Sequence, residues 1–143
     1  MVLLTAPLDG EQQPRLYARH FRGAITYREV LRTLPYFRSR VGTPLYIIWD
    51  HLCAHTAKVV QRYFAEHASD FQEEWLPGYS PELNPEEQCN HWVKRELENS
   101  LPSSVDELLS QTRRGFRRLQ HKPRILAGFF RHAGLDLNCD LQS

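Results

Sequence analysis

Two short segments at the start of the chain have the hydrophobic pattern of paired strands. Residues 2–7 are mostly apolar, residues 15–21 alternate polar and apolar side chains, and a stretch containing Asp9-Gly10 separates them. Alternation with a period of two is typical of strands, and a Gly-containing connection between such runs is typical of a hairpin. The pattern therefore predicts an N-terminal β-hairpin.

A helix and an apolar strand are predicted next. Thr26 can cap a helix that extends to about Arg40, because apolar residues recur between them at helical spacing, and Pro35 predicts a kink in it. The uninterrupted apolar run Leu45–Trp49 predicts a strand buried on both faces of a parallel or mixed sheet. Asp50 stands at the carboxyl end of this strand.

A second helix and strand are predicted after Asp50. An amphipathic helix is predicted to start at Thr56, and a further short strand is predicted at residues 71–76. A stiff Pro-rich loop, residues 77–85, follows. Alternating strands and helices of this kind predict an α/β first half.

Helices alone are predicted in the remainder. Pro85 is a favourable first helical residue, and the stretch from Ser104 to Glu107 fits a capping box for the next helix. Pro123 breaks that helix, and a last helix reaches about Ala133. The predicted fold class is therefore α/β with a helical C-terminal tail.

Composition bounds the class of protein. The chain has 143 residues, of which 41% are hydrophobic and 24% charged, as in one soluble globular domain. The longest apolar run is too short to cross a bilayer, and the N-terminus lacks the features of a signal peptide. Three cysteines without a C-x-x-C pair are typical of reduced thiols. We expect a cytoplasmic protein without a membrane partner.

Positive charge is concentrated in one segment. The formal net charge is +1, yet the stretch from Leu108 to Arg131 holds seven basic residues and no acidic one. A solvated helix face is one interpretation. Contact with DNA phosphates is the other, and we favour it because the charge exceeds what a neutral surface needs.

Two carboxylates lie where metal chemistry is expected. Asp50 ends the apolar strand, and ligands of open α/β sheets gather beyond the carboxyl ends of strands. Glu86 and Glu87 open a helix after the Pro-rich loop. Oxygen ligands of this kind suit Mg²⁺ or Mn²⁺, and a pair of such ions can drive phosphodiester cleavage and transfer.

Two motifs resemble a known family. Residues 49–55 read WDHLCAH and residues 76–88 read LPGYSPELNPEEQ, followed by Trp92, Lys94 and Arg95. They closely resemble the DDE transposases of the mariner-like superfamily and their bacterial insertion-sequence relatives, and the likeness runs from about Val2 to Leu97. The second motif is long and specific.

The resemblance implies roles for individual residues. Asp50 matches the family's second catalytic Asp and Glu87 its final catalytic Glu, with 36 residues between them. We expect the two carboxylates to lie close together and to bind Mg²⁺ or Mn²⁺, two ions in the complete site. His51 replaces the usual Asn, and Glu86 stands where the family has an apolar residue. The implied supporting and DNA-binding residues are His55, Asn84, Lys94, Arg95, Arg113, Arg114, Arg117 and Arg118.

The resemblance also implies an incomplete fold. The family's first catalytic Asp lies on the first, central strand of a ribonuclease H-like sheet, well over sixty residues before the second Asp, whereas 49 residues precede Asp50. We interpret Asp9 as a turn residue. Residues 1–100 are then a partial ribonuclease H-like DDE catalytic domain without its first strand, and residues 101–143 a helical basic tail packed on it.

The function expected is part of a bacterial, nucleoid-associated transposase for metal-dependent DNA strand cleavage and transfer, inactive alone. Its partners would be transposon ends and target DNA, with an upstream transposase polypeptide or self-association completing the sheet. The alternative is a non-catalytic DNA-binding or dimerising remnant. A zinc site is a further, disfavoured interpretation, because the spacings in its ligand set are not those of structural zinc sites. That set is His51, Cys53, His55, Cys89 and His91.

Overall fold

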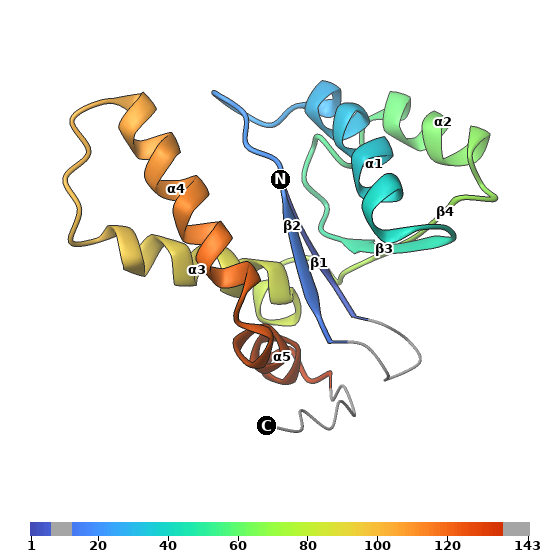
Figure 1. Ribbon diagram of the computed structural model, residues 1–143. Helices are drawn as coiled ribbons and strands as arrows, with labels where there is room; N and C mark the ends of the chain where they lie inside the picture. Colours follow the sequence, from blue (N-terminus) through green and yellow to red (C-terminus); the bar gives the residue numbers. More distant parts are fainter. Residues whose placement is uncertain (7–12, 136–143) are drawn as a thin grey trace. The chain divides into compact units, whose positions relative to one another are not determined.

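The computed structural model describes residues 1–6 and 13–135, which form two compact units (Figure 1). Unit 1 comprises Phe21–Ser80 together with Met1. Unit 2 comprises Val2–His20 and the chain from Pro81 onward. The predicted turn at Asp9-Gly10 lies outside the described residues.

The N-terminal hairpin is confirmed. Strands β1 (Val2–Thr5) and β2 (Arg15–Ala18) pair antiparallel, with Leu4 opposite Leu16. Leu16 is 3% exposed and belongs to the core of unit 2. The hairpin therefore packs through one face, as its alternating pattern predicted.

Helix α1 (Tyr27–Val41) begins at the predicted cap. The Thr26 hydroxyl accepts the Arg28 N–H, and the Glu29 carboxylate accepts the Thr26 N–H at 2.9 Å, which completes a capping box. The Thr26 hydroxyl also donates to the Glu29 carboxylate, and this bond, together with that from the Thr26 N–H, lowers the pKa of Glu29. The helix continues through Pro35 to Val41 and ends at Gly42, whose φ is +97°.

Strands β3 (Leu45–Trp49) and β4 (Phe71–Trp75) pair in parallel, with Trp49 opposite Trp75. The predicted burial of β3 on both faces is wrong. Leu45, Ile47 and Trp49 are buried, but Tyr46 and Ile48 are 58% and 56% exposed. Within the described part of unit 1, the buried face packs on helices, as where Trp49 meets Phe64, and nothing covers the other face. An apolar run cannot reveal which faces are covered.

The crossover helix α2 (Lys58–Glu66) starts two residues later than predicted. Thr56 is not its cap, because residues 52–56 form a turn in which the His55 and Thr56 N–H groups both donate to the Leu52 carbonyl. The Thr56 hydroxyl donates to the Cys53 carbonyl at 3.4 Å. The Thr56 hydroxyl therefore donates to a carbonyl of this turn and does not accept a helix N–H as a cap would.

Unit 2 is built by helices on the hairpin. The 3₁₀ helix η1 (Pro81–Leu83) leads into α3 (Pro85–Leu97), and α4 (Val105–Gln120) and α5 (Pro123–His132) follow. Helix α4 packs on α3 and β2, and α5 packs on α3, α4 and β2. The core is formed by Leu16, Cys89, Val93, Phe116, Leu119 and Leu126.

The capping box predicted at Ser104 is half formed. The Ser104 hydroxyl accepts the Glu107 N–H at 3.1 Å, as predicted. The Glu107 carboxylate accepts from the N–H and hydroxyl of Ser103 instead of the Ser104 N–H. The bonds from Ser103 lower the pKa of Glu107.

In the part of the chain that the structure describes, no helix is long and apolar enough to cross a membrane. The division into a catalytic domain (1–100) and a tail (101–143) stays a prediction.

Candidate active site

The Asp50 carboxylate is held on one oxygen and open on the other. Its Oδ1 accepts the Leu52 N–H at 3.2 Å and lies 2.8 Å from Nδ1 of His55. Among the described residues, no hydrogen bond reaches Oδ2, and the side chain is 47% exposed. One oxygen is therefore positioned by the protein while the other can bind a cation.

His55 reaches Asp50 because the chain turns back after β3. The turn closes with the His55 N–H donating to the Leu52 carbonyl at 2.8 Å. Gln61 on α2 anchors the turn, since its Nε2 donates to the His55 carbonyl at 3.3 Å. The His55 side chain is 14% exposed, so its ring is fixed in place.

Four aromatic rings stack at this end of the sheet, and we name them the ring column. His55 lies on Trp49 with centroids 4.5 Å apart, Trp49 lies 5.6 Å from Trp75, and Trp75 lies 5.1 Å from His51. The two tryptophans meet because they end paired strands. His51, which replaces the family's usual Asn, stacks on Trp75, while the hydrogen bonds to Asp50 come from Leu52 and His55.

The ring column was not predicted from the sequence. Tryptophan as the last residue of two parallel strands was the available signal, because equal register places the two side chains together.

Glu87 lies in the first turn of α3. Asn84 caps this helix, its Oδ1 accepting the Glu86 N–H at 3.1 Å, and its carbonyl accepts the Glu87 N–H. Glu86 is bonded by Nδ2 of Asn90 at 2.8 Å, whereas the Glu87 side chain is exposed. Asn84 thus supports the helix start, and of the two acids Glu87 is the more available to a ligand.

Asp50 belongs to unit 1 and Glu87 to unit 2. Their proximity, and the shared metal site that depends on it, stays a prediction. Within residues 1–6 and 13–135, no group of three or more His, Cys, Asp or Glu side chains is placed to hold a metal ion.

The donor set nevertheless fits a hard cation better than zinc. Asp50 offers a free carboxylate oxygen, as Mg²⁺ and Mn²⁺ prefer. Zinc binds thiolate, but burial raises the pKa of the Cys89 thiol to about 12, and this thiol donates to the Pro85 carbonyl. Nδ1 of His55 is engaged by Asp50.

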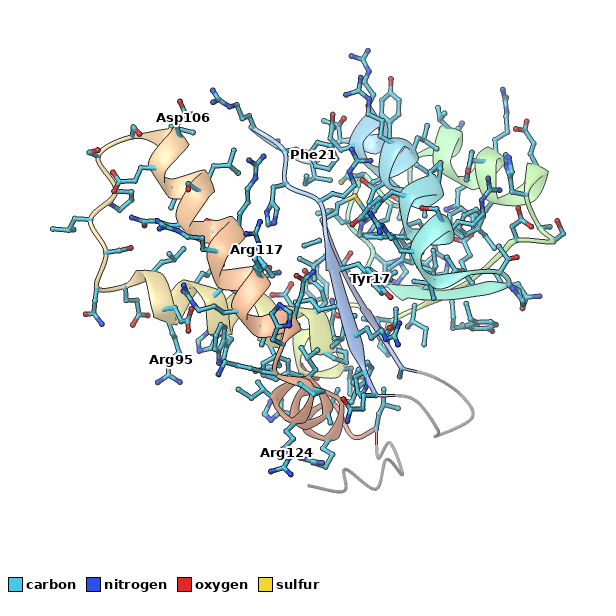
Figure 2. All side chains as sticks on the ribbon, viewed as in Figure 1. Tyr17, Phe21, Arg95, Asp106, Arg117 and Arg124 are labelled. Carbon is cyan, nitrogen blue, oxygen red and sulfur yellow. The ribbon has the colours of Figure 1, made fainter. Side chains whose placement is uncertain are left out.

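The predicted DNA-binding residues are exposed on α3 and α4. We name them the basic set: Lys94, Arg95, Arg113, Arg114, Arg117 and Arg118. On α4 the four arginines span an arc of about 140° at 100° per residue, away from the buried Phe116 and Leu119. Figure 2 shows Arg95 extending away from α3, and Arg124 likewise from α5.

One member of the basic set is not free. Arg118 forms an ion pair with Glu96 of α3 through Nε and Nη2. From the sequence alone, the four α4 arginines were equivalent candidates for DNA contact. In the structure, the Glu96 carboxylate partly neutralises Arg118.

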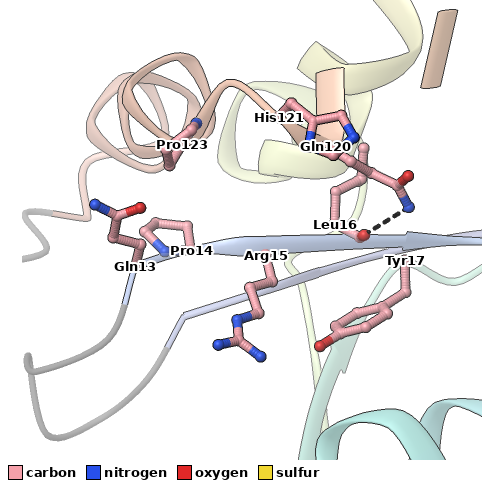
Figure 3. Close-up of a pocket in the computed structure, with 8 residues that line it drawn as sticks. All are labelled: Gln13, Pro14, Arg15, Leu16, Tyr17, Gln120, His121 and Pro123. Carbon is pink, nitrogen blue, oxygen red and sulfur yellow. Dashed lines mark hydrogen bonds between the residues drawn. The ribbon is translucent and has the colours of Figure 1, made fainter. Parts of the chain in front are cut away.

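A shallow groove of about 840 Å³ lies elsewhere in unit 2 (Figure 3). It runs between β2 and the α4–α5 junction, where Nε2 of Gln120 donates to the Leu16 carbonyl at 3.0 Å. Arg15, Tyr17 and His121 are among its lining residues, and none of the predicted site residues is.

Comparison with known protein families shows which family the chain belongs to. The family described as DDE superfamily endonuclease matches residues 15–109. The chain belongs to this family. The match contains Asp50, His55, Asn84, Glu87, Lys94 and Arg95, and it ends before the four arginines of α4.

In two further comparisons, no curated protein and no solved structure was found to match the chain. The mixed α/β architecture, with small sheets and five helices in the described residues, is consistent with an α/β nuclease-like fold. The family suggests a transposase-like nuclease function on DNA, and its members generally use divalent metal ions.

Proposed function

We propose that Asp50 and Glu87 are two of the metal-binding carboxylates of a DNA transposase that cleaves and joins strands with Mg²⁺ or Mn²⁺. The observation that carries the proposal is the Asp50 carboxylate, with Oδ1 held and Oδ2 open, inside the segment that matches the family. A carboxylate at the end of an α/β strand stands where such folds place ligand chemistry.

The two carboxylates would hold the divalent ions between them. Such ions, when bound, activate the attacking oxygen and stabilise the leaving oxygen of a phosphodiester. The contribution of the chain itself is to orient the ligands. With Nδ1 protonated, His55 donates to Oδ1 of Asp50, and stacking on Trp49 keeps the imidazole in that position.

The basic set would bind the phosphates of transposon ends and of target DNA. Exposed arginines neutralise backbone phosphates without reading base sequence, so binding is steeply salt-dependent and weakly specific. Sequence-specific recognition of transposon ends would belong to other parts of the transposase.

The chain alone is proposed to be inactive. A DDE site uses three carboxylates, and the motifs assign two of them, Asp50 and Glu87. A missing ligand misplaces the reacting groups, and small misplacements cost orders of magnitude in rate. An upstream transposase polypeptide would supply the third carboxylate.

Calorimetric titration with Mn²⁺ tests the metal site. We expect Asp50→Asn to weaken Mn²⁺ binding by about tenfold or more, since a metal ligand is lost. Glu82→Gln is the matched control, because Glu82 is an exposed acid on η1, and it should bind like the parent. Equal affinities for all three proteins would contradict the proposal.

A strand-transfer assay with Mg²⁺ and Mn²⁺ tests the inactivity. We expect the 143-residue chain to give no product above the Asp50→Ala background. Robust activity that Asp50→Ala abolishes would show that the chain completes the site itself, with Asp9 as the candidate third carboxylate.

A second candidate is a non-catalytic DNA-binding or dimerising remnant. The observation in its favour is that the exposed α4 arginines lie beyond the family match, so their charge is not part of the matched nuclease segment. DNA binding that needs these arginines, together with Mn²⁺ binding that ignores Asp50, would favour the remnant.

A further inference from the structure

The backbone of β3 is paired on one side. The Leu45 N–H donates to the Asp70 carbonyl, and the Trp49 carbonyl accepts the Leu76 N–H. In a parallel pair, both backbone groups of every second residue face the partner strand, so Leu45, Ile47 and Trp49 face β4. The N–H and C=O groups of Tyr46 and Ile48 therefore face the opposite edge, and among the described residues no third strand pairs there.

This free edge lacks the usual protection against pairing. Natural edge strands carry charges, prolines or bulges, whereas β3 reads LYIIW. Its two edge-facing residues, Tyr46 and Ile48, are the ones with exposed side chains. Strand β4, in contrast, reads FQEEW and carries Glu73 and Glu74. Of the two sheet edges, β3 has the composition of an inner strand and β4 that of an outer one.

We propose that the β3 edge pairs antiparallel with β3 of a second copy of the chain, which makes a four-stranded sheet across a two-fold axis. This proposal concerns the chain on its own and does not depend on the proposed nuclease function. An upstream polypeptide that completed the sheet would compete with the second copy for the same edge. The axis would pass by Ile47, so that Tyr46 of one copy lies opposite Ile48 of the other.

In this register, every backbone N–H and C=O group at the β3 edge finds a hydrogen-bond partner. Tyr46 and Ile48 then form hydrogen-bonded pairs, and each pair exchanges both N–H···O bonds. The two copies together offer four donors and four acceptors at this edge, and four bonds use them all. Tyr46 also lies against Ile48 of the second copy, an aromatic and β-branched pair of the kind that stabilises sheets.

The charges and the symmetry favour a dimer that does not extend further. No Asp, Glu, Lys, Arg or His lies within Leu45–Trp49, so the two copies bring no like charges together in the paired segment. A two-fold contact closes on itself, and the outer edge of the four-stranded sheet is then the acidic β4. The expected assembly is therefore a dimer and not a fibre.

Sedimentation velocity from ~5 to ~200 µM tests the assembly, since a single strand pair makes a small and weak interface. We expect a reversible monomer–dimer equilibrium. Ile48→Pro should shift the dissociation constant at least tenfold, because it removes one edge donor and leaves the bonds to β4 intact. Ile48→Thr, which keeps the N–H and β-branching, is the matched control and should dimerise like the parent.

Far-UV circular dichroism of each variant shows whether the fold is kept. A chain that stays monomeric throughout the range, or an Ile48→Pro variant that folds and dimerises like the parent, would overturn the proposal.

Disulfide trapping tests the register without destabilising the sheet. In a Cys53→Ser, Cys139→Ser background, Tyr46→Cys and Ile48→Cys chains should cross-link when mixed, because opposed Cα atoms lie ~5.5 Å apart. Tyr46→Cys alone should not cross-link, because its two copies lie about two residues out of register, beyond ~7 Å. Equal cross-linking of Tyr46→Cys alone and of the mixture would contradict the register.

Discussion

We name the segment Trp49–His55, which holds Asp50, the Asp50 corner. The Asp50 corner and the basic set hold their charged groups in opposite ways. Asp50 receives a backbone N–H and an imidazole, and that imidazole is itself held by stacking on Trp49. The α4 arginines are exposed, and the ion pair of Arg118 with Glu96 joins two helix surfaces. A metal ligand must keep one geometry, whereas phosphate attraction tolerates mobile charges.

The largest expected effect on binding is a loss of DNA affinity. Replacing Arg113, Arg114, Arg117 and Arg118 together by Ala should lower the salt slope of duplex binding by roughly 3, because Arg118 is already paired and each phosphate contact contributes about 0.9. The affinity near ~0.1 M salt should fall on the order of 10²- to 10³-fold. Fluorescence anisotropy at several salt concentrations measures both.

Single variants sharpen this prediction. Arg117→Ala should cost more affinity than Arg118→Ala, since the latter removes an arginine already engaged by Glu96. An unchanged slope in the quadruple variant would show that DNA binds elsewhere.

The next effect is on the stability of the Asp50 corner. Trp49→Ala should lower the free energy of unfolding by about 3–5 kcal/mol, because Trp49 is 7% exposed and contacts Phe64, Trp75 and His55. Tyr46→Ala, on the exposed face of the same strand, should cost less than about 1 kcal/mol. Urea unfolding provides the comparison, and equal losses for both would contradict the described faces of β3.

A smaller effect tests the packing that supports the basic set. A Cβ at Gly115 on α4 would lie 2.9 Å from Cγ1 of Val93 on α3. Gly115→Ala should therefore destabilise the protein by about 1–3 kcal/mol. Gly128→Ala on α5 is the matched control, since its Cβ would meet nothing closer than 3.9 Å, and it should stabilise by roughly 0.5–1 kcal/mol. Thermal unfolding measures both changes. Melting temperatures that shift in the same direction for both variants would argue against this helix contact.

The smallest effect concerns pH. His20 lies against Phe116 of α4, and burial, with the positive charge of Arg113 acting in the same direction, lowers the pKa of His20. The folded state then favours the neutral ring, so stability is complete above pH ~6.5 and is lost as the pH falls towards the lower folded pKa. Urea midpoints between pH ~7.5 and ~5 should show the loss, and His20→Gln should reduce it. His91→Gln, at an exposed position of α3, is the control and should keep it.

Local sequence signals predicted most of the helices and strands. The cap at Thr26, the parallel strands and the start of α3 at Pro85 follow from patterns within a few residues. The exposed face of β3 and the Arg118–Glu96 pair depend on what packs nearby, which no local pattern encodes. The stacking of Trp49 on Trp75 depends likewise on strand register.

Paramagnetic broadening by Mn²⁺ tests the central claim most directly, because it reports which amides lie near a bound ion. In ¹H–¹⁵N spectra of the parent chain, we predict selective broadening of the Leu52 and His55 amides together with those of Glu87 and Gln88. Asp50→Asn should abolish it at both places, and Glu82→Gln should leave it unchanged. Broadening that spares residues 52–55, or that persists in Asp50→Asn, would contradict the assignment of Asp50 and Glu87 to one metal site.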